Sequence, residues 1–420
     1  MYESGGKTFV SNELFKTKKV LTYTKNIPLG WVDYPEKEET YNINFNKTHR
    51  ILILGATGSG KSWITRSLMN RCFLSGVNPV CMTDIAPEYF TSTYPLENEL
   101  KKFILPIEEP TSFPIKVYYP CFLHKFVGFN LPQQIIFQYN LKDIQPSDLM
   151  AFINYDQLSF NAKLEVEDLI SKLSKNRDAF TDINTLINYI SEKNISTYTK
   201  RVLIKTFMNL QNLGVFGEEY PTENFIDDIN NNLIPDLNLF GWQRLDFKTH
   251  VGVYISLIIR KLLAARQLRQ LNPDKHLLLI FEELHEFAPK RTVNYAQVLT
   301  KKAIRDAVFT GRKEKISMLF VTQSPETIDP AIIEQCDLIL IPKDFEKYKL
   351  KEIVKNYLPD YYTYPYEFNI RMNEYLSSLR RWRDGARDWL VLEKGGNMER
   401  ITPLGPLSMH KQEGFVSEEE

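Results

Sequence analysis

The residues best suited to chemistry form an eight-residue stretch rich in glycine. It reads Gly55-Ala56-Thr57-Gly58-Ser59-Gly60-Lys61-Ser62, follows the apolar run Ile51 to Leu54 and precedes a helix-like stretch from Trp63 to Phe73. Backbone N–H groups at a helix N-terminus bind anions, and glycines adopt the positive φ angles that a phosphate-binding loop requires. The spacing G-x-x-x-x-G-K-[ST] therefore predicts that these eight residues hold the phosphates of a nucleotide.

Two side chains at the end of this loop have distinct expected roles with ATP and Mg²⁺. Lys61 is expected to reach the β- and γ-phosphates as a compact charge, and the hydroxyl of Ser62 to join the coordination sphere of Mg²⁺. The alternative is a glycine-rich turn after a buried strand. That interpretation leaves the adjacent Lys-Ser pair unexplained.

Two acidic residues, Glu282 and Glu283, follow the apolar run His276 to Phe281. An acid at the end of a buried parallel strand beside a phosphate loop can hold Mg²⁺, and its neighbour can polarise the water that attacks the γ-phosphate. We therefore expect Glu282 to be a metal ligand and Glu283 to be the catalytic base. The alternative is a solvated helix N-terminus, which also favours carboxylates.

A polar residue, Gln323, forms the C-terminal end of another expected strand, Ile316 to Gln323. Open parallel sheets bind ligands beyond the carboxyl ends of their strands. We therefore expect Gln323 to lie beside the phosphates and to sense the γ-phosphate during catalysis.

These side chains can meet only if the strands that carry them share one sheet. The run at 51–54, the helical stretch after it and the run at 79–84 follow one another in so short a span that they predict a right-handed parallel crossover. Further strands of the core are expected at 233–237, 276–283, 316–323 and 338–341. The expected fold class is α/β: a P-loop NTPase of the RecA-like type, whose mostly parallel sheet is flanked by helices and carries an inserted all-helical lobe.

The expected organisation has five parts. They are a short N-terminal arm or strand pair at 1–48, the first part of the ATPase core at 49–140, the helical insertion at 141–232, the second part of the core at 233–345, and a C-terminal extension of helix, strand and tail at 346–420.

Composition limits the class of protein. Lys plus Arg and Asp plus Glu number 52 each, so any surface that binds nucleic acid must be local. The four cysteines lack C-x-x-C spacing, which argues against a zinc site. The N-terminus does not resemble a signal peptide, and Arg260 and Lys261 interrupt the longest apolar-rich stretch, Val251 to Ala265. We expect a cytoplasmic protein without a membrane span.

The best local basic cluster lies between the two acids and Gln323. Its members are Lys301, Lys302, Arg305, Arg312, Lys313 and Lys315, against only Asp306 and Glu314. A second basic flank, at Arg260, Lys261, Arg266 and Arg269, is more typical of a solvated helix face.

Taken together, these motifs resemble the HerA/FtsK superfamily of DNA-pumping ATPases, and most closely its archaeal HerA-like branch. Residues 55–62 resemble the Walker A motif, and 282–289 resemble the family's Walker B motif. Three further blocks match in order: Asp84 to Tyr89, Gly311 to Lys313, and Thr322 to Pro325.

The resemblance implies a homo-oligomeric ring, usually a hexamer, with ATP at each subunit boundary and double-stranded DNA in the central channel. By this analogy Arg312 acts in trans on a neighbour's γ-phosphate, where an arginine stabilises the charge that develops. Lys313 and Arg305 are alternatives for this role, and a surface turn is the non-functional interpretation of Gly311 to Lys313.

The sequence departs from the family pattern in two places. Glu282 replaces the more usual Asp, which affects the expected magnesium geometry. The residues ahead of the phosphate loop are too few for the N-terminal β-barrel of cellular HerA, so its nuclease partnership does not carry over directly. A shortened HerA-like protein also fits an archaeal virus or plasmid, with a capsid or secretion partner.

The leading hypothesis is an ATP-driven DNA translocase, acting in genome packaging, plasmid transfer or DNA end processing. Its contacts with DNA are expected to be mainly to phosphates, because a motor must pass over any sequence. Three alternatives stay open: a motor of the same core that moves protein in secretion or pilus assembly, a small-molecule kinase, and a degenerate nucleotide-binding scaffold.

Overall fold

The computed structural model describes residues 24–409, except 132–133, 154, 156–157, 176–181, 218, 221–223, 244–247, 347, 351–352, 354–356 and 358–364. No helix among these residues has both the length and the apolar character needed to cross a membrane.

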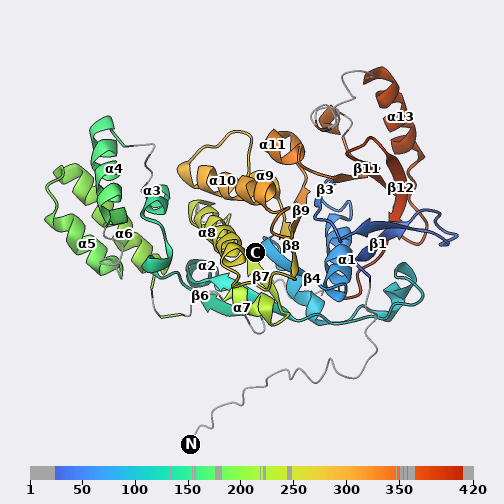
Figure 1. Cartoon of the computed structure of the whole chain (residues 1–420), viewed down its shortest axis with the longest axis horizontal. Helices are drawn as coiled ribbons and strands as arrows, with labels where there is room; N and C mark the ends of the chain where they lie inside the picture. The colour runs from blue at the N-terminus through green and yellow to red at the C-terminus, as the bar shows by residue number, and fades with distance from the viewer. Residues whose placement is uncertain are drawn as a thin grey trace, which may run out of the picture.

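A single twelve-stranded sheet organises the molecule, with strand order β2-β1-β12-β11-β10-β3-β9-β8-β4-β7-β5-β6 (Figure 1). The run from β10 to β6 is parallel, and β11, β12, β1 and β2 extend it with antiparallel pairing. The strands are β1 (Asn26–Trp31), β2 (Thr40–Asn44), β3 (Arg50–Leu54), β4 (Val77–Asp84), β5 (Ile115–Pro120), β6 (Ile135–Phe137), β7 (Ile234–Asn238), β8 (His276–Phe281), β9 (Ile316–Thr322), β10 (Leu338–Pro342), β11 (Trp389–Glu393) and β12 (Met398–Pro403).

Helices cover both faces of this sheet and gather at one end of it (Figure 1). They are α1 (Lys61–Leu74), α2 (Cys121–Val127), α3 (Leu149–Phe152), α4 (Phe160–Lys175), α5 (Ile183–Glu192), α6 (Thr197–Leu213), α7 (Phe225–Asn230), α8 (Lys248–Gln267), α9 (Leu284–Phe287), α10 (Tyr295–Thr310), α11 (Pro330–Ile333) and α13 (Pro365–Ser378).

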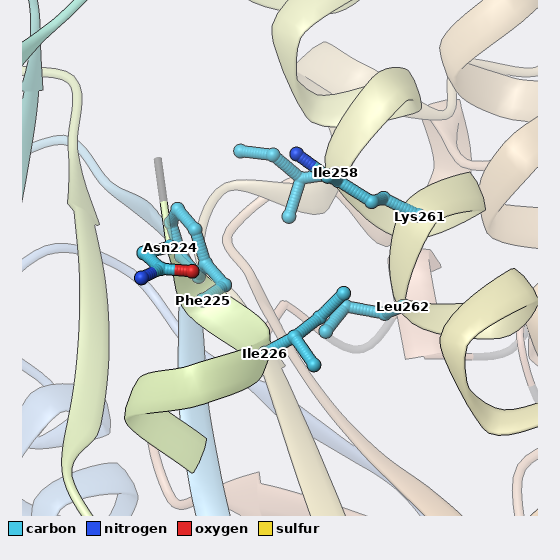
Figure 2. A pocket seen from close by; sticks show the side chains of 6 residues that line it. All are labelled: Asn224, Phe225, Ile226, Ile258, Lys261 and Leu262. Carbon is cyan, nitrogen blue, oxygen red and sulfur yellow. The ribbon is translucent and has the colours of Figure 1, made fainter. Parts of the chain in front are cut away.

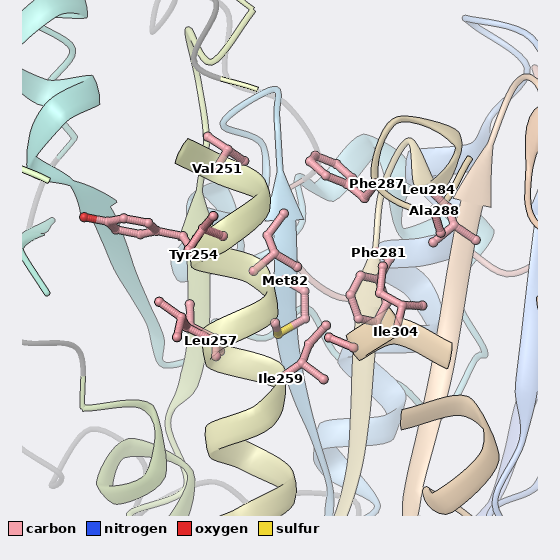
Figure 3. Packing of buried hydrophobic residues seen from close by; sticks show 14 of the residues in the cluster. Met82, Val251, Tyr254, Leu257, Ile259, Phe281, Leu284, Phe287, Ala288 and Ile304 are labelled. Carbon is pink, nitrogen blue, oxygen red and sulfur yellow. The ribbon is translucent and has the colours of Figure 1, made fainter. Parts of the chain in front are cut away.

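The central strands are apolar throughout because each contributes to two cores. On β8, Leu279 and Phe281 belong to the core beneath α8 and α10, whereas Leu278 and Ile280 belong to the core beneath α1. Successive side chains of a strand point to opposite faces, so a strand covered on both faces reads as a continuous apolar run. Figure 3 shows the first of these cores, with Phe281 between the strands and the helices.

Three helices of the region 141–232, α4, α5 and α6, lie to one side of the sheet (Figure 1). Their buried residues recur at helical spacing, as with Val166, Leu169 and Leu173 on α4. In sequence they lie between the edge strand β6 and strand β7. The division of the chain into five parts stays a prediction.

The N-terminal and C-terminal strands lie side by side. β1 pairs with β2 and also with β12, where Trp31 faces Thr402. Strands from the two ends of the described chain therefore extend the same edge of the sheet, beyond β11.

Helices α8 and α10 approach closely at Gly252. Thr300 Oγ1 donates a hydrogen bond to the Gly252 carbonyl at 2.8 Å, and a Cβ placed at Gly252 would lie 2.8 Å from that same oxygen. Real Cβ atoms essentially never approach so closely, so the helix pair depends on glycine at this position.

We expect Gly252→Ala to lower the free energy of unfolding by about 1–3 kcal/mol, the usual effect of overpacking. If the site were not crowded, the same substitution would raise the free energy of unfolding, because alanine is a better helix former than glycine. Thermal denaturation measures the effect. Gly395→Ala, where nothing lies within 4 Å of the added methyl, is the control. A higher Tm for Gly252→Ala contradicts the prediction.

Candidate functional site

The glycine-rich loop joins β3 to α1, and three of its glycines have positive φ. The angles are 148° at Gly55, 75° at Gly58 and 101° at Gly60, the residue that precedes the first turn of α1. A Cβ at Gly55 would lie 2.3 Å from Ser59 Oγ. The loop therefore closes around the N-terminus of α1, where unpaired backbone N–H groups bind anions.

Lys61 lies between this loop and a group of acids. Its Nζ donates to the carbonyl oxygens of Gly55 at 2.8 Å and Ala56 at 3.1 Å. Burial lowers the pKa of Lys61, and nearby carboxylates, led by Glu283 and Glu282, act in the opposite direction. The structure thus brings the predicted phosphate-binding lysine and the predicted acid pair into one site.

Parallel pairing explains why residues so distant in sequence meet here. β9 lies between β3 and β8, with Leu54 opposite Thr322 and Phe281 opposite Phe320. The three strands therefore end at the same edge of the sheet. Gln323, just beyond β9, accepts a hydrogen bond from Thr57 Oγ1 at 3.4 Å and so borders the phosphate loop.

Glu282 is held by residues of β4 and of the segment after it. Thr83 Oγ1 donates to the Glu282 carbonyl at 2.8 Å and accepts from the Glu282 N–H at 2.6 Å. Tyr89 donates its hydroxyl hydrogen to Glu282 Oε1 at 2.8 Å. Burial, with the neighbouring carboxylates of Asp84 and Glu88, raises the pKa of Glu282 to about 8. A divalent cation beside it would favour the ionised form.

Glu283 has a backbone conformation that is unusual for its residue type. Its φ of 43° and ψ of 48° are left-handed, which costs a residue with a Cβ roughly 1–2 kcal/mol. Its Oε2 lies 3.2 Å from His285 Nδ1, which is also 3.1 Å from Thr322 Oγ1. Strain of this kind is often found at functional sites.

Behind the site lies a pair of buried acids that the sequence analysis did not assign. Asp84 ends β4 and Asp236 lies on the neighbouring strand β7, and both are fully buried. Burial raises the pKa of Asp236 to about 8, and burial together with Asp236 raises the pKa of Asp84. Burial of two neighbouring carboxyl groups disfavours the state in which both are ionised. In the sequence, the position of Asp236 within a mostly apolar strand was the one sign of a buried acid here.

Arg312 lies far from its own phosphate loop, at the opposite edge of the sheet. Its guanidinium contacts Asp337 Oδ1 at 3.1 Å, and Asp337 also accepts from the backbone N–H of Arg50, the first residue of β3. The phosphate loop begins at the other end of that five-residue strand, roughly 13–16 Å away. The Arg312 side chain is 53% exposed, so a neighbouring molecule can contact it.

The structure divides the expected basic cluster, because five of its six residues line two separate grooves and Arg312 lines neither. The first, which we call the α10 groove, has a volume of about 320 Å³ and is lined by Thr292, Val298, Lys301, Lys302, Arg305, Asp306 and Phe309. The second, the edge groove, has a volume of about 450 Å³ and is lined by Arg266, Gln267, Arg269, Pro273, Lys313, Glu314 and Lys315.

Several of these cations already have partners within the chain. Lys301 and Arg305 both lie 3.6 Å from Asp329, and Lys315 lies 3.4 Å from Asp274. Of the second basic flank, Arg266 is buried and donates to backbone carbonyls, and Arg260 pairs with Asp148. Structural roles therefore account for part of the positive charge.

The residues present fit ATP and Mg²⁺. Ser59 Oγ is buried in the loop and has no hydrogen-bond partner among the described residues, so a phosphate oxygen could use it. Ser62 is the second residue of α1. The described part of the chain has no group of three or more His, Cys, Asp or Glu that could hold a metal. Mg²⁺ binds in proteins through one or two protein ligands together with phosphates and water.

A separate pocket between α7 and α8 is too small for a nucleotide. Figure 2 shows its lining residues, Asn224, Phe225, Ile226, Ile258, Lys261 and Leu262. Its volume of about 40 Å³ admits only one or a few water molecules.

The fold and the site define a P-loop ATPase in which one strand separates the phosphate-loop strand from the acid strand. The family model of the central domain of helicase HerA matches residues 27–258, more than half of the chain. The chain belongs to this family, which confirms the predicted relationship to HerA/FtsK-type ATPases.

Two named relatives are similar over part of their length. The chain is 24% identical over 322 residues to the DNA double-strand break repair helicase HerA of Sulfurisphaera tokodaii, covering 73% of this chain and 57% of that protein. It is 24% identical over 230 residues to a probable helicase of Methanocaldococcus jannaschii, covering 51% and 43%. The chain thus spans about half the length of these relatives.

A solved structure supports the fold assignment. VirB4 of Thermoanaerobacter pseudethanolicus superposes with a TM-score of 0.57 at 13% identity, covering 90% of this chain and 96% of that chain. Its similarity and the observed sheet confirm the predicted α/β P-loop fold.

We expect Glu283→Gln to reduce the rate of ATP hydrolysis by at least about 100-fold while nucleotide affinity stays near that of the wild type. The amide keeps the side chain's shape but cannot accept the proton of the attacking water. Steady-state phosphate release and nucleotide titration measure the two quantities. Glu286→Gln, in the same turn, is the matched control because Glu286 pairs with Lys248. Unchanged turnover in Glu283→Gln would exclude its role as base.

Proposed function

We propose that this protein is an ATP-hydrolysing motor that moves double-stranded DNA through a ring of identical subunits. One observation carries the proposal: the phosphate loop and the acid pair share one edge of the sheet, whereas Arg312 is exposed at the other. Membership of the HerA family supports it.

The residues around the loop account for hydrolysis. Glu283 accepts the proton of the attacking water, and Lys61 and the loop N–H groups hold the phosphates. Gln323 contacts the γ-phosphate from the end of β9. Ser62 and Glu282 would hold Mg²⁺, which would supply positive charge to offset that of the phosphates.

The site is complete only when a second subunit supplies Arg312. The exposed face of α10 leads toward this arginine and combines apolar with basic side chains. Val298 and Phe309 on this face are 43% and 51% exposed, and Lys302 and Arg305 lie between them at helical spacing. Apolar side chains flanked by charges suit contact with a second copy of the chain. A ring with one ATP at each boundary follows, and six subunits is the size proposed.

The edge groove provides a positive surface for the DNA backbone that is separate from the α10 face used between subunits. In the edge groove, Arg269 and Lys313 form no ion pair with the described residues. Contacts with phosphates are independent of sequence, as translocation requires, and weaken as salt rises.

The DNA substrate is tested by the ATPase rate with and without duplex DNA at two salt concentrations. We expect duplex DNA to increase the rate severalfold at low salt and less at high salt, because phosphate contacts release counterions. Single-stranded DNA and an unfolded polypeptide serve as comparison substrates. Absence of stimulation by duplex DNA at either salt concentration contradicts the proposal, and stimulation by polypeptide alone favours the protein-moving alternative.

The action of Arg312 across a boundary is tested by mixing variants. Lys61→Ala and Arg312→Ala should each lose most ATPase activity, and an equal mixture should regain part of it. About a quarter of the boundaries in a random mixture combine an intact Lys61 with a neighbour's intact Arg312. Mixing Lys61→Ala with the Lys61→Ala/Arg312→Ala double variant is the control and should stay inactive. No recovery in a mixture whose subunits demonstrably exchange would show that Arg312 does not act in trans.

A further inference from the structure

Arg387 contacts the phosphate loop from the C-terminal part of the chain. Its Nη1 donates a hydrogen bond to the Gly58 carbonyl oxygen at 2.6 Å, across 329 positions of sequence. Arg387 lies two residues before β11, and it belongs to none of the sequence motifs described above. Among the described residues it joins Gln323 and Lys61 as a side chain that hydrogen-bonds to the loop.

The backbone that carries Arg387 is firmly held. Arg381 and Arg387 face each other across an antiparallel bridge, so residues 381–387 form a tight hairpin. The buried carboxylate of Asp388 accepts hydrogen bonds from Trp382 Nε1 at 2.9 Å and from Thr402 Oγ1 at 2.7 Å. Asp388 thereby ties the hairpin to β12. Arg387 is thus presented to the loop by a fixed element, which is what a binding residue requires.

The strand after this hairpin also supports the loop. Trp389 is buried and lies 3.8 Å from the position of a Cβ on Gly60, and its pairing partner on β10, Pro342, lies 3.1 Å from that of Gly55. The C-terminal strands therefore form one wall of the phosphate loop. Arg387 lies two residues before the first residue of β11, on the same side of the loop.

The charge of Arg387 has no partner of opposite sign among the described residues. By contrast, Arg380 pairs with Asp388 and Arg381 pairs with Asp344. A guanidinium has five N–H donors, and the Gly58 carbonyl is a neutral acceptor. The partly exposed Arg387 is therefore free to bind an anion at the loop.

The strand order shows which end of a nucleotide Arg387 would meet. Gln323 borders the loop from β9, and the acid pair lies one strand further on β8, so the γ-phosphate end is on that side. Arg387 borders the loop from the β11 side, beyond β10. A nucleotide whose γ-phosphate faces the acid pair would direct its α-phosphate and nucleoside toward Arg387.

We propose that Arg387 binds the nucleoside-proximal phosphates of the nucleotide within its own subunit. This assignment rests on nucleotide binding as described under the proposed function, but not on DNA or on a ring. Arg387 then serves ATP and ADP alike, whereas Arg312 serves the γ-phosphate of a neighbour's ATP. Interactions made equally with substrate and transition state change KM but leave kcat unchanged.

The test compares Arg387→Ala with Arg383→Ala. Arg383 is an exposed arginine of the same hairpin that has no contact with the loop among the described residues. Fluorescent ADP and a non-hydrolysable ATP analogue are titrated onto each variant, and kcat and KM for ATP are measured. We expect Arg387→Ala to raise both dissociation constants and KM by roughly tenfold or more, with kcat within twofold of the wild type. Arg383→Ala should match the wild type.

Several outcomes would overturn the assignment. They are dissociation constants in Arg387→Ala within twofold of the wild type, weakening of the ATP analogue alone with loss of kcat, or equal weakening in Arg383→Ala. Arg387→Lys, with an unchanged Tm, should bind ADP more tightly than Arg387→Ala, because it retains the charge. If the wild type binds ADP and hydrolyses ATP without response to DNA, the proposed motor fails while the role of Arg387 is still decided by these titrations.

Discussion

Parallel pairing of β3, β9, β8 and β4 is the constraint on which the rest of the structure depends. Because the strands are parallel, their carboxyl ends lie together, and the residues that follow each strand are close to one another in space. Side chains then lock these ends to each other. Thr83 joins β4 to Glu282, and His285 links the turn after β8 to Thr322 of β9. A shift of one residue in any register would turn these side chains to the other face.

The same geometry separates the two halves of the proposed reaction. Each strand runs from one end of the sheet to the other. A residue in the loop before β9 therefore lies at the opposite end of the strands from the loop after β3, and it cannot reach phosphates bound there. Arg312 is in that position, held by Asp337 at the entry to the sheet. The separation makes a second subunit necessary for any contact of Arg312 with phosphate. The antiparallel return of β11, in contrast, leads the chain back to the phosphate edge within one subunit.

At the end of the sheet that carries the phosphate loop, burial shifts the pKa values of both the acidic and the basic side chains toward their neutral forms. Glu282, Asp84 and Asp236 lie close together, and burial raises the pKa of each. Lys61 lies near the acids that face the loop, while burial lowers its own pKa. Carboxyl groups in such a site share protons, and a cation or a change in nearby charge redistributes them.

The sequence by itself was enough to predict the parallel α/β core and the meeting of the glycine-rich loop with the acid pair and Gln323, because glycine spacing and doubly buried strands are local patterns with few alternative structures. The chemical roles of these residues stay predictions. Tertiary structure alone decided the pairing of Asp84 with Asp236, the division of the basic residues between two grooves, and the contact of Arg387 with Gly58. These depend on strand order and on the antiparallel return of β11, and contacts between residues hundreds of positions apart leave no periodic signal in a single sequence. The position of Arg312 combines the two: its motif was visible in the sequence, but only the sheet places it at the opposite edge from its own loop.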